Sequence, residues 1–394
     1  MDPVSILTSL TVILVVGILI GIIAKKLGIP NMLLLILMGI LLRQSPFDFS
    51  ILADNFLITI SILTMVMLVF DGSSRLKIKE LDTYSMVSIE ITLLVVVFNL
   101  LFLSIATYFI MGVKSVLLCF LFAGVMSGTD PSSVLMLFQT KSNKVTDLLK
   151  FESIINTPIV VLIPFIILDI MKLGSLEVTS FVDQILPFLQ QIVVAIGTGV
   201  FIGLIVFRGM KKFYSEQISP LMLITSALMT YILAQNMDGN GVLAGTVLGL
   251  MFGNIYIKQK ASLQEFSYML SNSFEIIVFI FVGFLISVSF TWELIVRSLV
   301  LFLIMQVLRF LAVYSSHLHD NLTLKNKIFM ALNAPKGIAV AVVAFLLMQD
   351  KVFTSSPEST TIINLILLFL IYSLTSSAIL SKFSKFFIHL KVEA

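Results

Sequence analysis

Two hydrophobic segments of this chain are interrupted by polar and helix-breaking residues, and these interruptions constrain the fold more than any other feature. The first interruption is residues 127–133, Ser-Gly-Thr-Asp-Pro-Ser-Ser, and the second is residues 333–337, Asn-Ala-Pro-Lys-Gly. One carboxylate, Asp130, lies in the first, and one ammonium, Lys336, lies in the second. A charge at membrane depth is costly and is a functional candidate by default. Broken helices carrying such charges are typical of the ion site of a secondary transporter.

The composition places the chain in a membrane. Of its 394 residues, 58% are hydrophobic and 12% are charged, with a mean hydropathy of +1.10, whereas a soluble domain is about half apolar and about a quarter charged. We therefore expect an all-α polytopic membrane protein that forms one transporter domain over residues 1–394, without a separate soluble domain. The one cysteine, Cys119, lies in an apolar run and is expected to serve in packing.

Because a membrane-spanning helix needs about 20 apolar residues, the sequence predicts about thirteen transmembrane spans. They cover residues 4–24, 29–43, 53–71, 84–111, 115–139, 146–171, 181–208, 216–236, 240–256, 264–289, 292–315, 325–349 and 360–384. Most of the 25 lysines and arginines then fall on the side of the membrane that holds the C-terminus. This predicts a multi-pass protein of the cell membrane, with the N-terminus outside and the C-terminus in the cytoplasm. We expect this membrane to be a prokaryotic plasma membrane.

The positions of unusual spans predict internal symmetry. The broken spans are the fifth and the twelfth, and the short, glycine-bearing spans are the second and the ninth, so that each pair is seven spans apart. Since an odd offset reverses the direction of crossing, we expect spans 1–6 and 8–13 to form an inverted repeat, with span 7 as the connector. The two unwound helices should then cross near the middle of the bilayer.

An unwound stretch in a membrane has special chemistry, because it leaves backbone N–H and C=O groups that hydrocarbon cannot satisfy. Asp130 can compensate the positive helix ends at the crossing, and Lys336 the negative ends. For Lys336 this structural role and a direct role in transport both stay open. Asp130 is in addition an oxygen ligand beside Thr129, and hard cations such as Na⁺ favour carboxylate, carbonyl and hydroxyl oxygens.

The sixth span carries a polar stripe at membrane depth. Glu152 and Asn156 are four residues apart and share a helix face, with Ser153 and Thr157 one step round. Such side chains often only link neighbouring helices. A buried carboxylate, however, needs a partner, and Arg309 in span 11 is the best candidate for a structural ion pair with Glu152.

Two further acidic residues lie in or at the end of spans. Asp71 ends the third span, where it is either interfacial or able to reach the ion site from the cytoplasmic side. Glu275 lies in the tenth span without an obvious partner, which favours a structural or gating role over a ligand role.

The sequence lacks the motifs of nucleotide binding, thiol redox chemistry, metalloproteases and serine hydrolases. We therefore expect no enzyme activity, no cofactor, no resident metal and no nucleic-acid partner. Transport energy should come from an ion gradient.

Six segments, in the right order over nearly the whole chain, carry a resemblance to a known family. They are Phe70–Leu76 (like FEGGL), Thr129–Pro131 (TDP), Glu152–Asn156 (the start of ESxxND), Phe274–Gly283, Arg309–Tyr314 (like RxxxVY) and Asn333–Ala341 (like GxRGxxxxA). These segments resemble the sodium/proton antiporters of the NhaP and NHE type, within the monovalent cation/proton antiporter superfamily.

The resemblance implies a homodimer in membrane lipid, in which a core domain of each protomer moves against a dimerisation domain. It implies Na⁺, or K⁺ or Li⁺, and H⁺ as substrates, an ion site on the TDP and ND segments, and a Glu152–Arg309 ion pair. Two positions depart from the family pattern. The aspartate of the ND motif is Thr157 here, and the arginine of the GxRG motif is Lys336.

The change at position 157 separates the functional hypotheses. In the first, the protein is a cation/proton antiporter working by alternating access. Asp130 then carries both ions, helped by oxygens of Thr129, Ser153, Asn156 and Thr157 and by Asp71. In the alternative, the missing acid has left an uncoupled or regulatory cation pathway. A third hypothesis, an organic-anion transporter, would use helix N-termini to hold a carboxylate, but Asp130 occupies that place.

Overall fold

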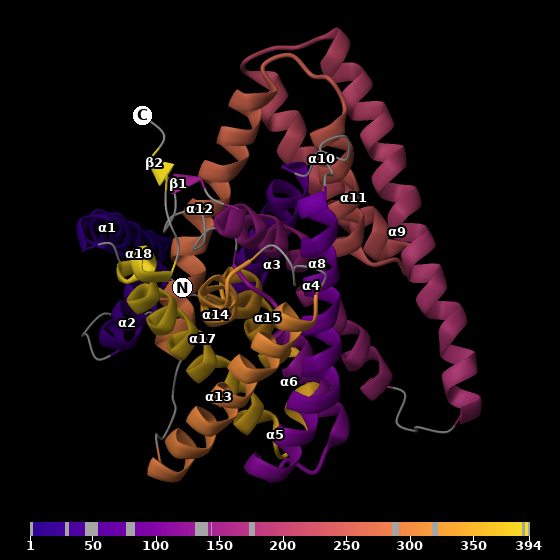
Figure 1. Ribbon diagram of the computed structural model, residues 1–394. Helices are drawn as coiled ribbons and strands as arrows, with labels where there is room; N and C mark the ends of the chain where they lie inside the picture. The colour runs from indigo at the N-terminus through magenta and orange to yellow at the C-terminus, as the bar shows by residue number, and fades with distance from the viewer. Residues whose placement is uncertain are drawn as a thin grey trace. The chain divides into compact units, whose positions relative to one another are not determined.

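The computed structural model describes residues 3–27, 31–43, 54–75, 83–130, 141–142, 144–172, 178–285, 291–316, 322–387 and 391–392. Nearly all of these residues are helical (Figure 1), which confirms the prediction of an all-α fold. A pair of two-residue antiparallel strands, β1 (Lys141–Ser142) and β2 (Lys391–Val392), was not predicted.

The helices agree closely with the predicted spans. In chain order they are α1 (Pro3–Leu27), α2 (Asn31–Leu42), α3 (Asp54–Ser74), α4 (Thr83–Phe98), the π-helix η3 (Asn99–Leu103), α5 (Ser104–Met111), α6 (Val116–Val125), α8 (Lys144–Lys172), α9 (Val178–Lys212), α10 (Ile218–Asn236), α11 (Gly241–Asn254), α12 (Lys260–Leu285), α13 (Trp292–Ser315), α14 (Leu324–Leu332), α15 (Ile338–Gln349), α16 (Lys351–Thr354), α17 (Ser359–Lys382) and α18 (Ser384–Phe387). Within the described residues, seven helices are long and apolar enough to span a membrane, and five shorter apolar helices accompany them.

Both predicted interruptions are present. Helix α6 ends at Val125 and the chain has left the helix by residue 128, while residues 131–139 of the fifth span lie outside the described residues. The twelfth span is divided into α14 and α15 by the non-helical residues 333–337. The second and ninth spans are short, as predicted, with 12 residues in α2 and 14 in α11.

The chain divides into two compact units. Unit 1 comprises Met1–Ile58, Asp82–Ile167 and Ile276–Ala394, and unit 2 comprises Thr59–Leu81 and Leu168–Glu275. Both interruptions belong to unit 1. The inverted repeat and the single transporter domain stay predictions.

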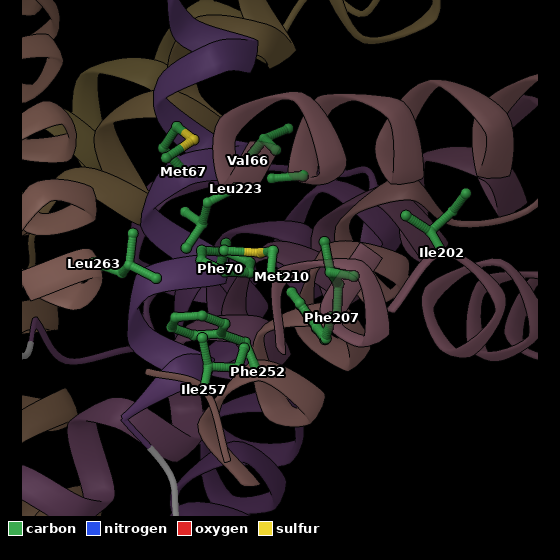
Figure 2. Close-up of a cluster of buried hydrophobic side chains, with 12 residues drawn as sticks. Val66, Met67, Phe70, Ile202, Phe207, Met210, Leu223, Phe252, Ile257 and Leu263 are labelled. Atoms are coloured by element: carbon green, nitrogen blue, oxygen red, sulfur yellow. The ribbon is translucent and has the colours of Figure 1, made fainter. Parts of the chain in front are cut away.

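A hydrophobic cluster holds unit 2 together. Side chains of α3, α9, α10, α11 and α12 converge on Phe70, Phe207 and Phe252 (Figure 2). The ring centroids of Phe70 and Phe252 are 5.6 Å apart, and those of Phe207 and Phe252 are 5.4 Å apart. Gly249 lets α11 approach α3 closely, because a Cβ at this position would collide with the Phe70 carbonyl oxygen.

Unit 1 uses the same device where α2 meets α12. A Cβ added to Gly39 would collide with the Ile280 carbonyl oxygen, and one added to Gly283 would collide with that of Ile36. Small residues that bring two backbones together are a common basis of helix packing in membranes.

Cys119 is buried in α6, where a packing residue is expected.

Candidate functional site

The two interruptions meet inside unit 1. The backbone N–H of Asp130 donates a 2.8 Å hydrogen bond to the carbonyl oxygen of Pro335. Residues 126–130 and 333–337 thus lie against each other, and we call this pair of segments the crossing. Its residues are buried almost throughout.

Lys336 satisfies the open C-terminal end of α6. Its Nζ donates hydrogen bonds of 2.6 Å to the carbonyl oxygens of both Met126 and Gly128, and its side chain is buried. Other carbonyls at this helix end accept from Ser127, whose N–H bonds Gly124 at 3.1 Å and whose hydroxyl bonds Ala123 at 2.8 Å. Helix ends in a membrane need such partners because water is absent.

Asp130 lies at the N-terminal end of a helix, α15, whereas the Lys336 amine lies at the C-terminal end of α6. A Cβ added to Gly337, the residue that immediately precedes α15, would collide with the carboxyl group of Asp130. The carboxyl group therefore packs against the N-terminus of α15, where the aligned peptide dipoles favour negative charge. Only glycine leaves room for this contact.

Helix α8 fixes the residue before Asp130. The N–H of Thr129 donates to Asn156 Oδ1 at 3.2 Å, and Asn156 Nδ2 donates to Thr129 Oγ1 at 2.7 Å. Asn156 thus uses both ends of its amide to orient Thr129. Ser153, one turn earlier, is also buried. The side chain of Thr157 lies outside the described part of the structure.

Glu152 and Arg309 form a buried two-pronged ion pair. The Nη1–Oε1 distance is 2.7 Å and the Nη2–Oε2 distance is 2.9 Å, with side chains that are 3% exposed for Arg309 and 1% for Glu152. Arg309 Nε also donates to the Met330 carbonyl oxygen at 3.4 Å. The pair therefore links α8, α13 and α14 beside the crossing.

The last span holds the second interruption, a role that the sequence analysis missed. Ser373 Oγ accepts from the N–H of Lys336 at 3.0 Å, and the Ser377 hydroxyl donates to Asn333 Oδ1. These serines are four residues apart, so they lie on one face of α17. That spacing within an apolar span is the signal that could have identified them.

Asn99 is a third residue that the sequence analysis missed. Its Nδ2 lies 3.3 Å from Ser127 Oγ and 3.5 Å from the Met126 carbonyl oxygen, so that η3 contacts the first interruption. A lone amide in the apolar run of residues 93–103 is the signal that could have identified it.

Asp71 and Glu275 belong to unit 2. Asp71 is buried near the end of α3 and pairs with Arg75, with distances of 3.0 Å from Nε to Oδ2 and 3.3 Å from Nη2 to Oδ1. The Arg75 guanidinium lies over the ring of Tyr268, 5.1 Å from its centroid. Glu275 is buried in α12.

We expect Lys336→Met to lower the free energy of unfolding by about 1–3 kcal/mol, since it leaves the Met126 and Gly128 carbonyls without their shared donor. Removing a desolvated amine offsets part of the loss. The check is the unfolding temperature of the purified protein in detergent. Lys351→Met, at an exposed position in α16, is the matched control. Equal unfolding temperatures for the two variants would contradict the role of Lys336 at this helix end.

Comparisons with known proteins identify the family of this chain. The profile of the family described as sodium/hydrogen exchanger, transmembrane, matches residues 10–382. The low-affinity Na⁺/H⁺ antiporter NhaS1 of Synechocystis sp. is 32% identical over 145 residues, which cover 36% of this chain and 27% of that protein. This chain therefore spans only about a quarter of that relative.

Two archaeal proteins match over a greater length. The probable Na⁺/H⁺ antiporter 2 of Methanocaldococcus jannaschii is 24% identical, with 87% of this chain and 85% of that protein covered. The structure of the sodium proton antiporter MjNhaP1 from the same organism superposes with a TM-score of 0.82 at 19% identity, covering 98% of each chain. At this identity the match shows the shared fold. Because the family profile covers nearly the whole sequence, the chain belongs to the sodium/hydrogen exchanger family of transmembrane proteins.

Proposed function

We propose that this protein is a secondary active transporter that exchanges a monovalent cation for protons by alternating access. Na⁺ is the cation that we propose first. The observation that carries the proposal is the position of Asp130. Its carboxyl group is buried at the crossing, against the N-terminus of α15 and next to Thr129. Membership of the sodium/hydrogen exchanger family supports the same activity.

Asp130 is the shared carrier in this proposal. A buried carboxylate binds either a proton or a cation, because each neutralises the same charge. Competition at one group then couples the two ions. K⁺ and Li⁺ are the other cations that the oxygen ligands of this site suit, and vesicle assays with each salt rank the three.

Neutral oxygens complete the proposed site. Thr129, Ser153 and Thr157 supply hydroxyl groups, and Asn156 acts mainly by orienting Thr129, since both ends of its amide contact that residue. In this proposal Asp71 binds the cation near the cytoplasmic mouth of the pathway. Its ion pair with Arg75 would compete with cation binding there.

The remaining residues have structural or gating roles in this proposal. Glu152 and Arg309 brace the core, Lys336 and Asp130 compensate the helix ends at the crossing, and Glu275 takes part in gating. The transporter is a homodimer in the cell membrane, with its N-terminus outside and its C-terminus in the cytoplasm.

The deciding experiment follows lumenal pH and ²²Na⁺ uptake in the same proteoliposomes, for the wild-type protein and the Thr157→Asp variant. Adding Na⁺ outside wild-type vesicles should make the lumen alkaline as Na⁺ enters and protons leave. Empty liposomes provide the control. If wild-type vesicles take up ²²Na⁺ without a pH change, and only Thr157→Asp couples the two ions, the uncoupled pathway replaces this proposal.

A further inference from the structure

The fourth span contains a widened turn that faces the crossing. Helices α4 and α5 are joined by the π-helix η3, in which the N–H of Ser104 bonds the carbonyl oxygen of Asn99, five residues earlier. The Ser104 hydroxyl donates to the Leu100 carbonyl oxygen, so a side chain satisfies a backbone group beside the wide turn. Turns of this kind occur often at functional sites.

The widened turn begins at Asn99, whose amide contacts the end of α6. Its Nδ2 approaches the Met126 carbonyl oxygen and Ser127 Oγ. The Met126 carbonyl is also an acceptor for Lys336 Nζ. Asn99 and Lys336, which come from different spans, therefore hold the same carbonyl, four residues before Asp130.

The other end of the Asn99 amide is unusual. Asn99 is 2% exposed, and its Oδ1 has no hydrogen-bond partner among the described residues. Buried polar atoms in folded proteins nearly always have a partner, which can be an ordered water. Among the described residues, the hydrogen bonds of this side-chain amide all go to the end of α6, so the contact with that end is its one visible polar role.

We propose that Asn99 is a positioning residue of the cation site, acting through the Met126 carbonyl and the Ser127 hydroxyl. These two groups set the direction in which the chain leaves α6, and hence the positions of Thr129 and Asp130. The inference rests on the proposed function, because it concerns the affinity of that site for its cation.

The alternative is that Asn99 only packs. Thr107, two turns further along the same span, supplies the comparison. Within the described residues, its buried hydroxyl donates only to the Leu103 carbonyl of its own span, at 2.7 Å. A purely structural asparagine would behave like Thr107 when replaced by an apolar residue of similar size.

The experiment compares Asn99→Leu with Thr107→Val in two measurements. The first is the KM for Na⁺ and the maximal rate of exchange in proteoliposomes. The second is the unfolding temperature in detergent, with and without Na⁺. Asn99→Leu should raise the KM about 3- to 10-fold, the loss expected for one hydrogen bond, and should reduce the stabilisation by Na⁺. Thr107→Val should leave the KM unchanged.

Ser127→Ala provides a second route to the same contact. It should raise the KM in the same direction, and the double variant should fall short of the product of the two single effects, because both remove one shared interaction. If Asn99→Leu does not fold, the KM of Ser127→Ala decides alone.

The outcomes separate this inference from the proposed function. An unchanged KM in Asn99→Leu, or in Ser127→Ala where it decides alone, overturns the positioning role while exchange by the wild-type protein stands. If the wild-type protein shows no exchange, the proposed function falls, and the stabilisation by Na⁺ alone decides the role of Asn99. Equal stabilisation of wild type and variant, or none in either, overturns the positioning role.

Discussion

Asp130→Asn should abolish Na⁺-dependent pH change in proteoliposomes, down to the level of empty vesicles. Asparagine has nearly the size of aspartate, so it can keep the packing against Gly337 and the backbone bond to Pro335. It cannot take up a proton or neutralise a cation near neutral pH, and both abilities are needed for competition at one group. The variant should fold, with only the loss of a favourable charge at the α15 N-terminus, about 0.3–1 kcal/mol.

The matched control is Asp169→Asn, which makes the same chemical change in a half-exposed pair with Lys172 at the end of α8. It should exchange at the wild-type rate. Retained exchange by a well-folded Asp130→Asn protein would remove Asp130 as the carrier and leave the site to be sought elsewhere.

The buried Glu152–Arg309 pair should give the largest effects on stability. Arg309→Leu leaves the Glu152 carboxylate buried without its guanidinium partner. Glu152→Leu leaves the Arg309 guanidinium buried without its carboxylate partner. Removing one partner of a buried pair costs about 3–5 kcal/mol, whereas removing both can cost much less. We therefore expect each single variant to unfold at a much lower temperature than the wild-type protein, and the double variant to recover much of the loss.

Helix α13 offers a control for this comparison of single and double variants. Arg297 and Glu293 lie four residues apart with an Nη2–Oε1 distance of 2.6 Å, but their side chains are 47% and 70% exposed. Exposed pairs contribute little to stability, so Arg297→Leu should unfold close to the wild-type temperature. If the effects of Glu152→Leu and Arg309→Leu simply add in the double variant, the two residues do not act as a pair.

The sequence identified the framework of this protein because its signals are local. Long apolar runs predicted the helices to within a few residues at most ends, and the Pro-, Gly- and Asp-bearing runs at 127–133 and 333–337 predicted the two interruptions. Hydrocarbon cannot satisfy open backbone groups, so this pattern has few alternative meanings in a membrane. The pairing of Glu152 with Arg309 was expected on the same ground, since a buried carboxylate needs a partner.

The missed features depend on contacts between distant segments. Ser373 and Ser377 read as ordinary helix-packing residues until α17 is seen to hold Lys336 and Asn333. Nothing in the run around Asn99 specifies a π-helix, because the extra residue matters only where η3 meets α6. The β1–β2 pair joins residues about 250 apart in the chain and involves two residues from each strand, too few for a recognisable strand pattern.

The hydrogen bond between Asp130 and Pro335 has a consequence for how the protein moves. Together with the two hydrogen bonds from the Lys336 side-chain amine to the Met126 and Gly128 carbonyl oxygens, it fastens the two interrupted helices to each other. Sliding one past the other would break three buried bonds at once. Any motion that exposes the carboxylate first to one side of the bilayer and then to the other must carry both helices as a single piece.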